Sequence, residues 1–440
     1  MAASFDSSLA PRAGRSFEAA VTPFAVVRKV AIVGFGTVGC SVARILSEHP
    51  HPSLRLTQVC TRSVERRRVS WLPSRVAWTD NFDVVLASDA DVIVELIGGL
   101  DPAAAWVRRA LACGKSVVTA NKQLIAHYGP ELSEIARQHG CRLLYGASVA
   151  GGVPVISGLQ DGLAGDRLSK ISGILNGTCN YILSRIEAGG LSFDVALKQA
   201  QKLGFAEADP TDDVAGYDAR AKLAILVRLA LHTQILPNEI ACSPITPIHG
   251  VDFAYAKELG CTIRQVSRAE LKDECLFASV QPALVPFSSA LARVQDSLNL
   301  VMATGQYGGE TVFSGHGAGG DPTAVAVVSD LISLVKAGKH VTPSFAQPLP
   351  RPTSNDFTSR HYLRFTIKDC PGLLAQIATV LSKHDINIDA VLQHPGYERA
   401  HLPFVVTLDE CPNSVVERAM EEVNALDFLV KPTLNLPILG

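Results

Sequence analysis

The chain lacks three features that mark particular classes of protein. Neither charge dominates, because 40 Lys and Arg stand against 42 Asp and Glu, and a net charge of −2 offers no electrostatic footprint for nucleic acid or an acidic membrane. No stretch approaches the ~20 apolar residues of a membrane span. The ten cysteines form no C-x-x-C pair, which argues against a disulfide framework or zinc knuckle and favours reduced thiols in the cytoplasm.

The length of 440 residues exceeds one typical hydrophobic core, so we expect two or three domains. Residues 1–27 lack the apolar segment of a secretory signal and are predicted to form an N-terminal extension. Their Arg and Ser content is the argument for an organelle transit peptide, and Asp6 and Glu18 are the argument against one.

A glycine-rich motif follows the first apolar run. Val30–Val33 reads as a buried strand, and a helix is predicted to continue through Leu46. The order strand, G-x-G-x-x-G, helix predicts a dinucleotide site. Its six residues are Gly34, Phe35, Gly36, Thr37, Val38 and Gly39. The alternative is a glycine turn in an α/β domain that binds no nucleotide.

The second predicted strand, residues 54–60, bears on the choice of cofactor. An NAD-binding fold usually carries Asp or Glu at this strand end to bind the ribose diol, and here the chain reads Thr61-Arg62. Arg62 is suited to a 2′-phosphate, so NADP is favoured and NAD stays open. The competing interpretation of Arg62 is a solvated basic start of a helix.

Strands and helices alternate up to Tyr145, which predicts a Rossmann-type doubly wound parallel sheet over residues 28–147, with a return helix at 318–340. Ligands bind at the carboxyl ends of such strands. Lys122 follows the predicted strand 116–119 and can therefore reach cofactor and substrate together. A surface lysine at a helix start is the alternative.

The stretch AQKLGFAEADPTDDVAGYDARAK, residues 200–222, concentrates acidic residues in a loop that Pro210 and Gly216 keep from being a packed helix. A strongly helical run then begins, so Asp218 and Lys222 stand at i and i+4 on one helix face. Such a group can bind a cationic substrate and protonate an oxyanion. The alternative is a solvated acidic loop beside an ordinary helical ion pair.

The spacing of Gly204, Glu207, Asp213, Asp218 and Lys222 resembles the signature of homoserine dehydrogenases. The same resemblance covers T-A-N-K at 119–122 and N-G-T-x-N-Y at 176–181. It implies reversible reduction of aspartate 4-semialdehyde by a nicotinamide, in an α+β catalytic and dimerisation domain over residues 148–317.

The resemblance also implies roles for single residues. Glu207 would take the substrate ammonium, with Asp213 and Asp218 shaping the electrostatics. Lys222 would donate the proton, with Lys122 nearby as an active-site lysine. Thr178 is expected to contact the substrate, and the alternative is that it caps a helix start.

Residues 147–154 resemble the family's monovalent-cation loop, which is built from backbone carbonyls and a glutamate. Gly146 stands in the place of that glutamate. The carbonyls of Val149, Gly151 and Val153 remain candidate ligands for Na⁺, a hard cation that prefers oxygen.

Residues 341–358 are rich in proline and are predicted to be a linker. Residues 359–440 show the order β-α-β-β-α-β of a ferredoxin-like unit. With Asp369-Cys370-Pro371-Gly372-Leu373 at the first turn, this unit resembles an ACT domain, which binds an amino-acid effector, with threonine expected. The alternative is a dimerisation module without a ligand.

Taken together, residues 28–440 resemble a monofunctional homoserine dehydrogenase that forms a homodimer or homotetramer. Two other classes stay open at this point. One is a related reductase of another amino-acid aldehyde, and the other is an amino-acid sensor without enzymatic activity.

Overall fold

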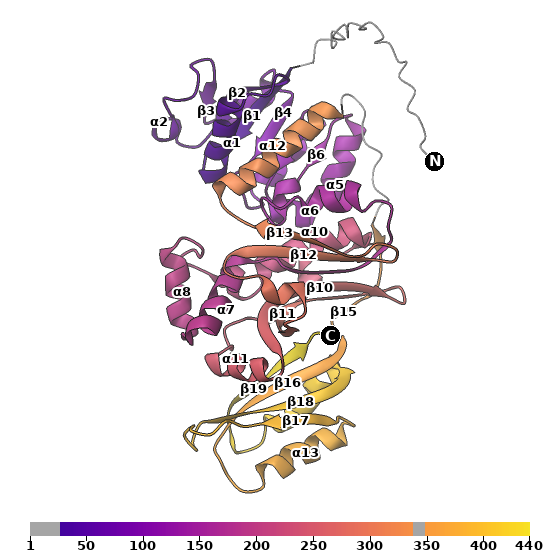
Figure 1. The fold of residues 1–440 in the computed structure, drawn as a ribbon. Coiled ribbons are helices and arrows are strands. Elements are labelled where there is room, and N and C mark those ends of the chain that lie inside the picture. Colours follow the sequence, from indigo (N-terminus) through magenta and orange to yellow (C-terminus); the bar gives the residue numbers. More distant parts are fainter. Residues whose placement is uncertain (1–26, 338–347) are drawn as a thin grey trace, which may run out of the picture.

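A computed structural model describes residues 27–337 and 348–440, and Figure 1 shows them as an upper, a middle and a lower part. The predicted N-terminal extension lies outside the described residues except for residue 27. The end of the predicted return helix and the first part of the predicted linker also lie outside them.

The upper part contains six parallel strands in the order β3-β2-β1-β4-β5-β6, which confirms the predicted Rossmann-type doubly wound sheet. The strands are β1 Arg28–Val33, β2 Leu54–Cys60, β3 Ala77–Thr79, β4 Val92–Glu95, β5 Ser116–Thr119 and β6 Leu143–Leu144. The helices are α1 Thr37–Glu48, α2 Val64–Arg67, α3 Phe82–Ala87, α4 Ala103–Ala112, α5 Lys122–Gln138 and, much later in the chain, α12 Gly320–Lys336.

Helices cover both faces of this sheet, which is why the buried part of β1, Val30–Val33, is apolar on both sides. Val30 and Ile32 point into a core shared with α1 and α12, whereas Ala31 and Val33 point into a second core shared with α4 and α5. Figure 1 shows α12 lying beside α1 although about 280 residues separate them in sequence. The chain therefore returns to the upper part after building the middle part.

The middle part is an antiparallel sheet in the order β13-β12-β7-β10-β11. Its strands are β7 Leu168–Ile174, β10 Cys261–Lys272, β11 Cys275–Pro286, β12 Leu298–Gly305 and β13 Gly309–His316, with short strands β8 Thr233–Gln234 and β9 Ala241–Cys242. The helices are α6 Val155–Ser157, α7 Gly177–Gly189, α8 Phe193–Lys202, α9 Thr211–Val214, α10 Tyr217–Ala230 and α11 Gly250–Glu258. Four further short turns of helix are η1 Gly146–Ser148, η2 Gly158–Gly162, η3 Pro237–Glu239 and η4 Ala290–Arg293.

Helix α10 is the centre of the middle part. Its sequence is apolar on nearly every side, and most of its residues are buried in one large core with the sheet. A helix that is apolar all round belongs in an interior. The charged residues Asp218 and Lys222 on this helix are consequently drawn into the protein and need partners there.

The lower part has the element order β16 Thr358–Ile367, α13 Leu373–Lys383, β17 Ile388–Leu392, β18 Leu402–Pro412, α14 Asn413–Val423 and β19 Leu429–Ile438. Its antiparallel sheet has the order β19-β16-β18-β17, which confirms the predicted ferredoxin-like fold.

The lower and middle parts are joined more closely than a linker would require. Strand β19 pairs with β11 at Ile438 and Leu284, and a single apolar core combines Tyr362 and Leu436 with residues of α7 and α11. Within the predicted linker, β14 Leu349–Pro350 pairs with β8 and β15 Thr353–Ser354 pairs with β11. The described part of this segment is therefore fastened to the sheets.

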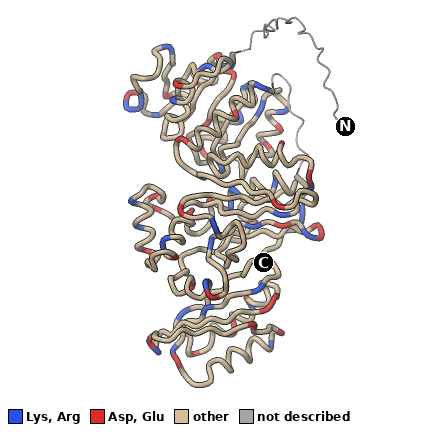
Figure 2. The backbone as a smooth tube through the Cα atoms, viewed as in Figure 1, with Lys and Arg blue, Asp and Glu red and all other residues tan. Residues whose placement is uncertain are grey.

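Positively and negatively charged residues are interspersed along the backbone in all three parts, as Figure 2 shows, in keeping with the balanced composition. In residues 27–337 and 348–440 no helix is long and apolar enough to cross a membrane.

Candidate active site

The glycine-rich turn between β1 and α1 uses its three glycines differently. Gly34 has φ of +103°, and a Cβ there would lie 2.6 Å from the Leu96 carbonyl. A Cβ on Gly39 would lie 2.1 Å from the Gly34 oxygen. Around Gly36 no atom of the described residues lies within 4 Å of such a Cβ. Packing requires the first and third glycine, whereas the second faces open space, as close approach of a pyrophosphate would need.

The other residues of the motif divide in the same way. Gly36 and Thr37 are exposed at the N-terminus of α1, where backbone N–H groups favour anions. Phe35 is 3% exposed and its ring meets Trp78 edge-on at 5.0 Å, so its side chain belongs to the core. Val38 is partly buried against the same core. Any ligand contact by Phe35 must therefore come from its backbone.

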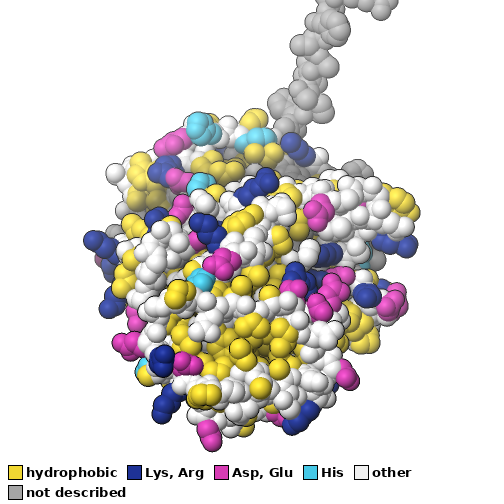
Figure 3. All heavy atoms as spheres, turned by 60° about the horizontal axis from the view of Figure 1, so that its bottom comes forward, with side chains coloured by type: hydrophobic (Ala, Val, Ile, Leu, Met, Phe, Trp, Pro, Cys, Tyr) yellow, Lys and Arg dark blue, Asp and Glu magenta, His cyan; other side chains and the backbone are white. Residues whose placement is uncertain are grey.

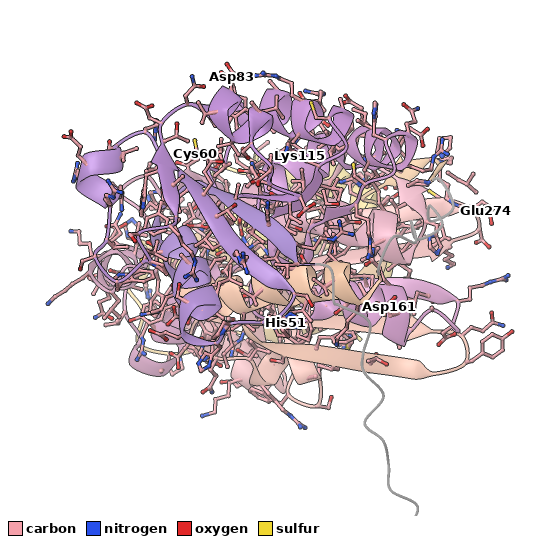
Figure 4. All side chains as sticks on the ribbon, turned by 90° about the horizontal axis from the view of Figure 1, so that it is seen from above. His51, Cys60, Asp83, Lys115, Asp161 and Glu274 are labelled. Atoms are coloured by element: carbon pink, nitrogen blue, oxygen red, sulfur yellow. The ribbon has the colours of Figure 1, made fainter. Side chains whose placement is uncertain are left out.

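Arg62 is exposed just beyond the carboxyl end of β2. Figure 4 labels His51 before this strand and Cys60 at its end, so the direction of the strand can be followed. Burial raises the pKa of the Cys60 thiol to about 11, and the nearby carboxylate of Asp80 adds to the effect. The carboxylate of Asp80, the residue after β3, thus lies near the end of β2, where the sequence of β2 itself offers no carboxylate.

The ends of β4 and β5 are tied together by Glu95, which sequence analysis missed. Its carboxylate accepts hydrogen bonds from the Thr119 hydroxyl at 2.6 Å and from the N–H groups of Ile97 at 2.9 Å and Gly98 at 3.2 Å. Burial raises its pKa. A polar residue at the end of the apolar run V-I-V-E was the available signal. Asn121 then fixes the neighbouring loop by donating to the Gly99 carbonyl at 2.6 Å.

Three charged side chains meet where the upper and middle parts touch. The ammonium of Lys222 lies 2.7 Å from Asp218 Oδ2, and that of Lys122 lies 3.0 Å from Asp218 Oδ1. Lys222 also donates to the Leu175 carbonyl at 2.8 Å. Lys122 begins α5 in the upper part, whereas the other two belong to α10. We call Lys122, Asp218 and Lys222 the charge centre.

Burial and opposite charge compete at the charge centre. Burial acts to raise the pKa of Asp218, but the ammonium groups of Lys222 and Lys122 outweigh it and hold this pKa below its usual range. The attraction of Asp218 raises the pKa of Lys122. Asp218 is therefore negatively charged and Lys122 positively charged throughout the neutral pH range.

Asp213 joins the charge centre through Asn176. The Asn176 amide donates to Asp213 Oδ1 at 2.7 Å and to Asp218 Oδ2 at 2.9 Å. Burial raises the pKa of Asp213. Sequence analysis named Asp213 but not Asn176, although the asparagine stood in the quoted N-G-T motif.

The acidic loop places its other predicted residues farther out. Glu207 is exposed, and in the described part of the chain its carboxylate forms no ion pair. Thr178 donates its hydroxyl to the Phe205 carbonyl at 2.6 Å, and the Tyr181 ring lies tilted against the Phe205 ring with 5.0 Å between their centroids. Thr178 therefore anchors the loop that carries Glu207. The N-cap of α7 is Asn176, whose Oδ1 accepts from Cys179 N–H.

The crossover from the upper to the middle part contains the predicted cation ligands. Val149, Gly151 and Val153 are buried, and Ala150 and Gly151 both have positive φ, so the backbone turns sharply between the candidate carbonyls. The Val153 carbonyl already accepts from Val155 N–H at 2.8 Å, which leaves one lone pair free. In the described ranges no three His, Cys, Asp or Glu side chains gather to hold a metal ion.

Asp330 of α12 fills the space beside Gly146. A Cβ on this glycine would lie 2.7 Å from Asp330 Oδ1, and the Gly146 N–H donates to Asp330 Oδ2 at 2.8 Å. Burial raises the pKa of Asp330 to about 7. A carboxylate is thus present where the sequence alone suggested that one was missing, and in this respect the residues fit a monovalent cation.

Comparison with protein families gives matches along most of the chain. The homoserine dehydrogenase model matches residues 154–332, and the model for the NAD binding domain of homoserine dehydrogenase matches residues 34–146. An ACT domain model matches residues 361–428.

Curated relatives and solved structures agree with this assignment. The homoserine dehydrogenase of Synechocystis is 37% identical over 421 residues, which cover 91% of this chain and 96% of that protein. That of Bacillus subtilis is 36% identical over 381 residues, covering 83% and 88%.

The crystal structure of a homoserine dehydrogenase from Thiobacillus denitrificans matches with a TM-score of 0.87 at 34% identity, over 94% of this chain and 98% of that one. Neither a reductase of another aldehyde nor a sensor without activity is favoured by matches of this extent. The chain belongs to the homoserine dehydrogenase family, with an NAD-binding domain, a catalytic domain and a C-terminal ACT domain.

Proposed function

We propose that the chain interconverts L-homoserine and L-aspartate 4-semialdehyde, and that Lys222 moves the proton in this reaction. The observation that carries the proposal is the geometry of the Lys222 ammonium. Of its three N–H groups, one points to Asp218 and one to the Leu175 carbonyl. The third is free to donate to a substrate oxygen.

In the direction of reduction, Lys222 donates its proton to the aldehyde oxygen as negative charge develops there. A bound nicotinamide supplies the hydride. Asp218 holds Lys222 in place, and its negative charge keeps Lys222 and Lys122 together in one site despite their mutual repulsion. Lys122 lies at the carboxyl end of β5, where it can contact cofactor and substrate.

The substrate is a zwitterion whose ammonium needs an anionic partner. Glu207 is our proposal for this partner, since the acidic loop is fastened at Phe205 and Glu207 itself remains unpaired within the described ranges. Asp213 and Asp218 add negative potential nearby. Thr178 supports this arrangement chiefly by holding the loop. The direct assay is reduction of NADP⁺ by purified protein with L-homoserine, and no turnover under saturating conditions would contradict the proposal.

For the cofactor we propose a preference for NADP over NAD. Exposed Arg62 at the end of β2 supports it, and a structural neighbour, a hyperthermophilic archaeal homoserine dehydrogenase, is in complex with NADPH. That neighbour has a TM-score of 0.62 at 25% identity and covers 73% of this chain and 100% of that one. Asp80 is the competing group, because a carboxylate can bind the ribose diol of NAD.

Two variants distinguish the contributions of Arg62 and Asp80 to cofactor preference. Arg62→Ala should raise KM for NADP⁺ by roughly tenfold and leave KM for NAD⁺ nearly unchanged, because a charge-assisted contact is worth about 1.5–3 kcal/mol. Asp80→Asn should have little effect on NADP⁺. If Asp80→Asn instead abolishes use of NAD⁺ while Arg62→Ala changes both cofactors equally, the preference for NADP is disproved.

We further propose that a monovalent cation such as Na⁺ binds the carbonyls of Val149, Gly151 and Val153, with Asp330 supplying the carboxylate. The approach of Asp330 to Gly146 supports this. The measurement is the rise in Tm on replacing choline chloride by NaCl at equal ionic strength.

The cation effect should disappear in Asp330→Ala and return in Gly146→Glu/Asp330→Ala, where the carboxylate is supplied from the other side. An equal rise in Asp330→Ala and in the unmodified enzyme would remove Asp330 from the site.

The ACT domain leads us to propose feedback inhibition by an amino acid, with threonine as the first candidate. The turn at 369–372 precedes α13, whose N–H groups suit an effector carboxylate, and Asp369 or Asn387 suits its ammonium. A homodimer or homotetramer and a cytoplasmic location also remain predictions. Threonine at millimolar concentration should lower activity; a response to no aspartate-family amino acid would refute the regulatory role.

A further inference from the structure

Asn176 uses every polar group of its side chain in one place. It lies two residues after the end of β7 and caps α7, with Oδ1 accepting from Cys179 N–H at 2.8 Å. Its two amide protons go to Asp213 Oδ1 at 2.7 Å and Asp218 Oδ2 at 2.9 Å. Asn176 is only 3% exposed, so water does not compete for these bonds.

The two carboxylates need a common donor because they repel each other. Asp218 is held by both lysines, whereas Asp213 stands on the short helix α9 behind the exposed acidic loop. The side-chain amide of Asn176 is the donor that ties Asp213 to this spot. Two carboxylates bound to one nitrogen are then kept at a fixed spacing beside two ammonium groups.

We infer that Asn176 is a positioning residue for homoserine oxidation and its reverse, because its amide fixes Asp213 against Asp218 and so sets the charge pattern around Lys222. Neither the family assignment nor the roles proposed above give this residue a part in the reaction. It acts through the carboxylates, without contact with the reacting atoms.

The pH dependence of activity reports this role. Asp213 is faced by Asp218 and Lys222 of α10, Lys122 of α5 and Cys179 of α7. Burial raises the pKa of Asp213, and the hydrogen bond from Asn176 opposes that rise. Removing the amide therefore raises the pKa of Asp213 further, so this carboxylate becomes protonated at a higher pH.

The test uses two variants that keep the helix cap. Asp and Ser are both good N-caps, so Asn176→Asp and Asn176→Ser preserve the bond to Cys179 N–H while removing both amide protons. The first adds a third carboxylate and the second adds no charge. The rate of aspartate 4-semialdehyde reduction should be followed from pH 5 to pH 8.

Both variants should lower kcat by roughly tenfold or more and move the acid limb of kcat/KM upward by about one pH unit, with the larger move for Asn176→Asp. KM for NADPH should stay unchanged, since the glycine turn is untouched. Asn81→Ser is the matched control: Asn81 caps α3 by accepting from Asp83 N–H at 2.8 Å, away from the charge centre, and its loss should move neither value.

The inference is overturned if Asn176→Ser keeps the acid limb of the unmodified enzyme. A fall in kcat together with an unmoved acid limb would mean that Asn176 serves the fold alone. A loss of thermal stability equal to that of Asn81→Ser, with normal kinetics, would reduce it to an ordinary helix cap.

Discussion

At the scale of single residues, the charge centre depends on the docking of two domains. Lys122 comes from α5 of the nucleotide-binding domain, whereas Asp218 and Lys222 come from α10 of the catalytic domain. Arg228 of α10 strengthens the same contact by donating to the Ile125 carbonyl of α5 at 2.7 Å. The site is therefore complete only when both helices are in place.

Glu207 gives a prediction at this scale. Glu207→Gln should raise KM for L-homoserine by roughly tenfold or more, because the substrate ammonium loses a charge-assisted contact of about 1.5–3 kcal/mol. Asp209→Asn is the control on the same loop, since the Asp209 carboxylate is already taken by Thr211. Steady-state kinetics of both variants decide the point. A collapsed kcat with an unchanged KM would reassign Glu207 to the chemical step.

The pairing of Asp218 with Lys222 could be predicted from sequence because both lie on one helix at i and i+4. The family resemblance placed Lys122 near Lys222, but spacing could not show its contact with Asp218, since nearly a hundred residues separate them and only docking brings them together. Asp330 was hidden for the same reason, since it reaches Gly146 from α12. Sequence patterns therefore predict contacts within one helix, but not contacts between segments that are far apart in the chain.

At the scale of elements, β16 and α11 share a buried ion pair. Arg364 Nη1 lies 3.2 Å from Asp252 Oδ2, and the Tyr362 hydroxyl donates to Asp252 Oδ1 at 2.8 Å. Asp252 is fully buried, and burial raises its pKa although Arg364 opposes the effect. These contacts fasten the ACT domain to a helix that also packs near α7. The predicted element order of this domain is confirmed, whereas its packing against the catalytic domain could not be predicted from the sequence.

Breaking the ion pair between Arg364 and Asp252 should destabilise the protein. Arg364→Met leaves the Asp252 carboxylate buried without its cation and should lower the free energy of unfolding by about 3–5 kcal/mol. Lys383→Met is the control in the same domain, because its ion pair with Glu422 is largely exposed and screened by water, so its loss should change stability little. Denaturant unfolding of both variants gives the comparison. Equal losses would show that burial of the pair has no energetic consequence.

At the scale of the whole molecule, the ACT domain lies at one end and its sheet ends there in an edge strand. β17 is the last strand of the sheet, and Ile388 and Val391 on it are exposed, as is Leu374 of α13. Figure 3 shows hydrophobic side chains gathered on the face that this end of the molecule presents. An apolar, unpaired edge strand is a ready template for a second copy. The sequence predicted dimerisation through residues 148–317, with a dimerisation module at residues 359–440 as the alternative for the C-terminal unit.

A charge on that edge should prevent association. Val391→Asp should shift the enzyme to a smaller species in light scattering, because a buried carboxylate without a partner opposes pairing. Lys383→Met again serves as a control in the same domain. If Val391→Asp keeps the mass of the unmodified enzyme, the oligomer is built through another surface.

If Lys222 moves the proton, its replacement by alanine should remove most of the turnover. We predict that kcat for NADP⁺ reduction by L-homoserine falls by on the order of 10²–10⁴, the usual range for a lost general acid or base, while NADP⁺ binding is retained. Lys198→Ala, on an exposed lysine of α8, should leave kcat unchanged. A folded Lys222→Ala enzyme with near-normal kcat would contradict the account.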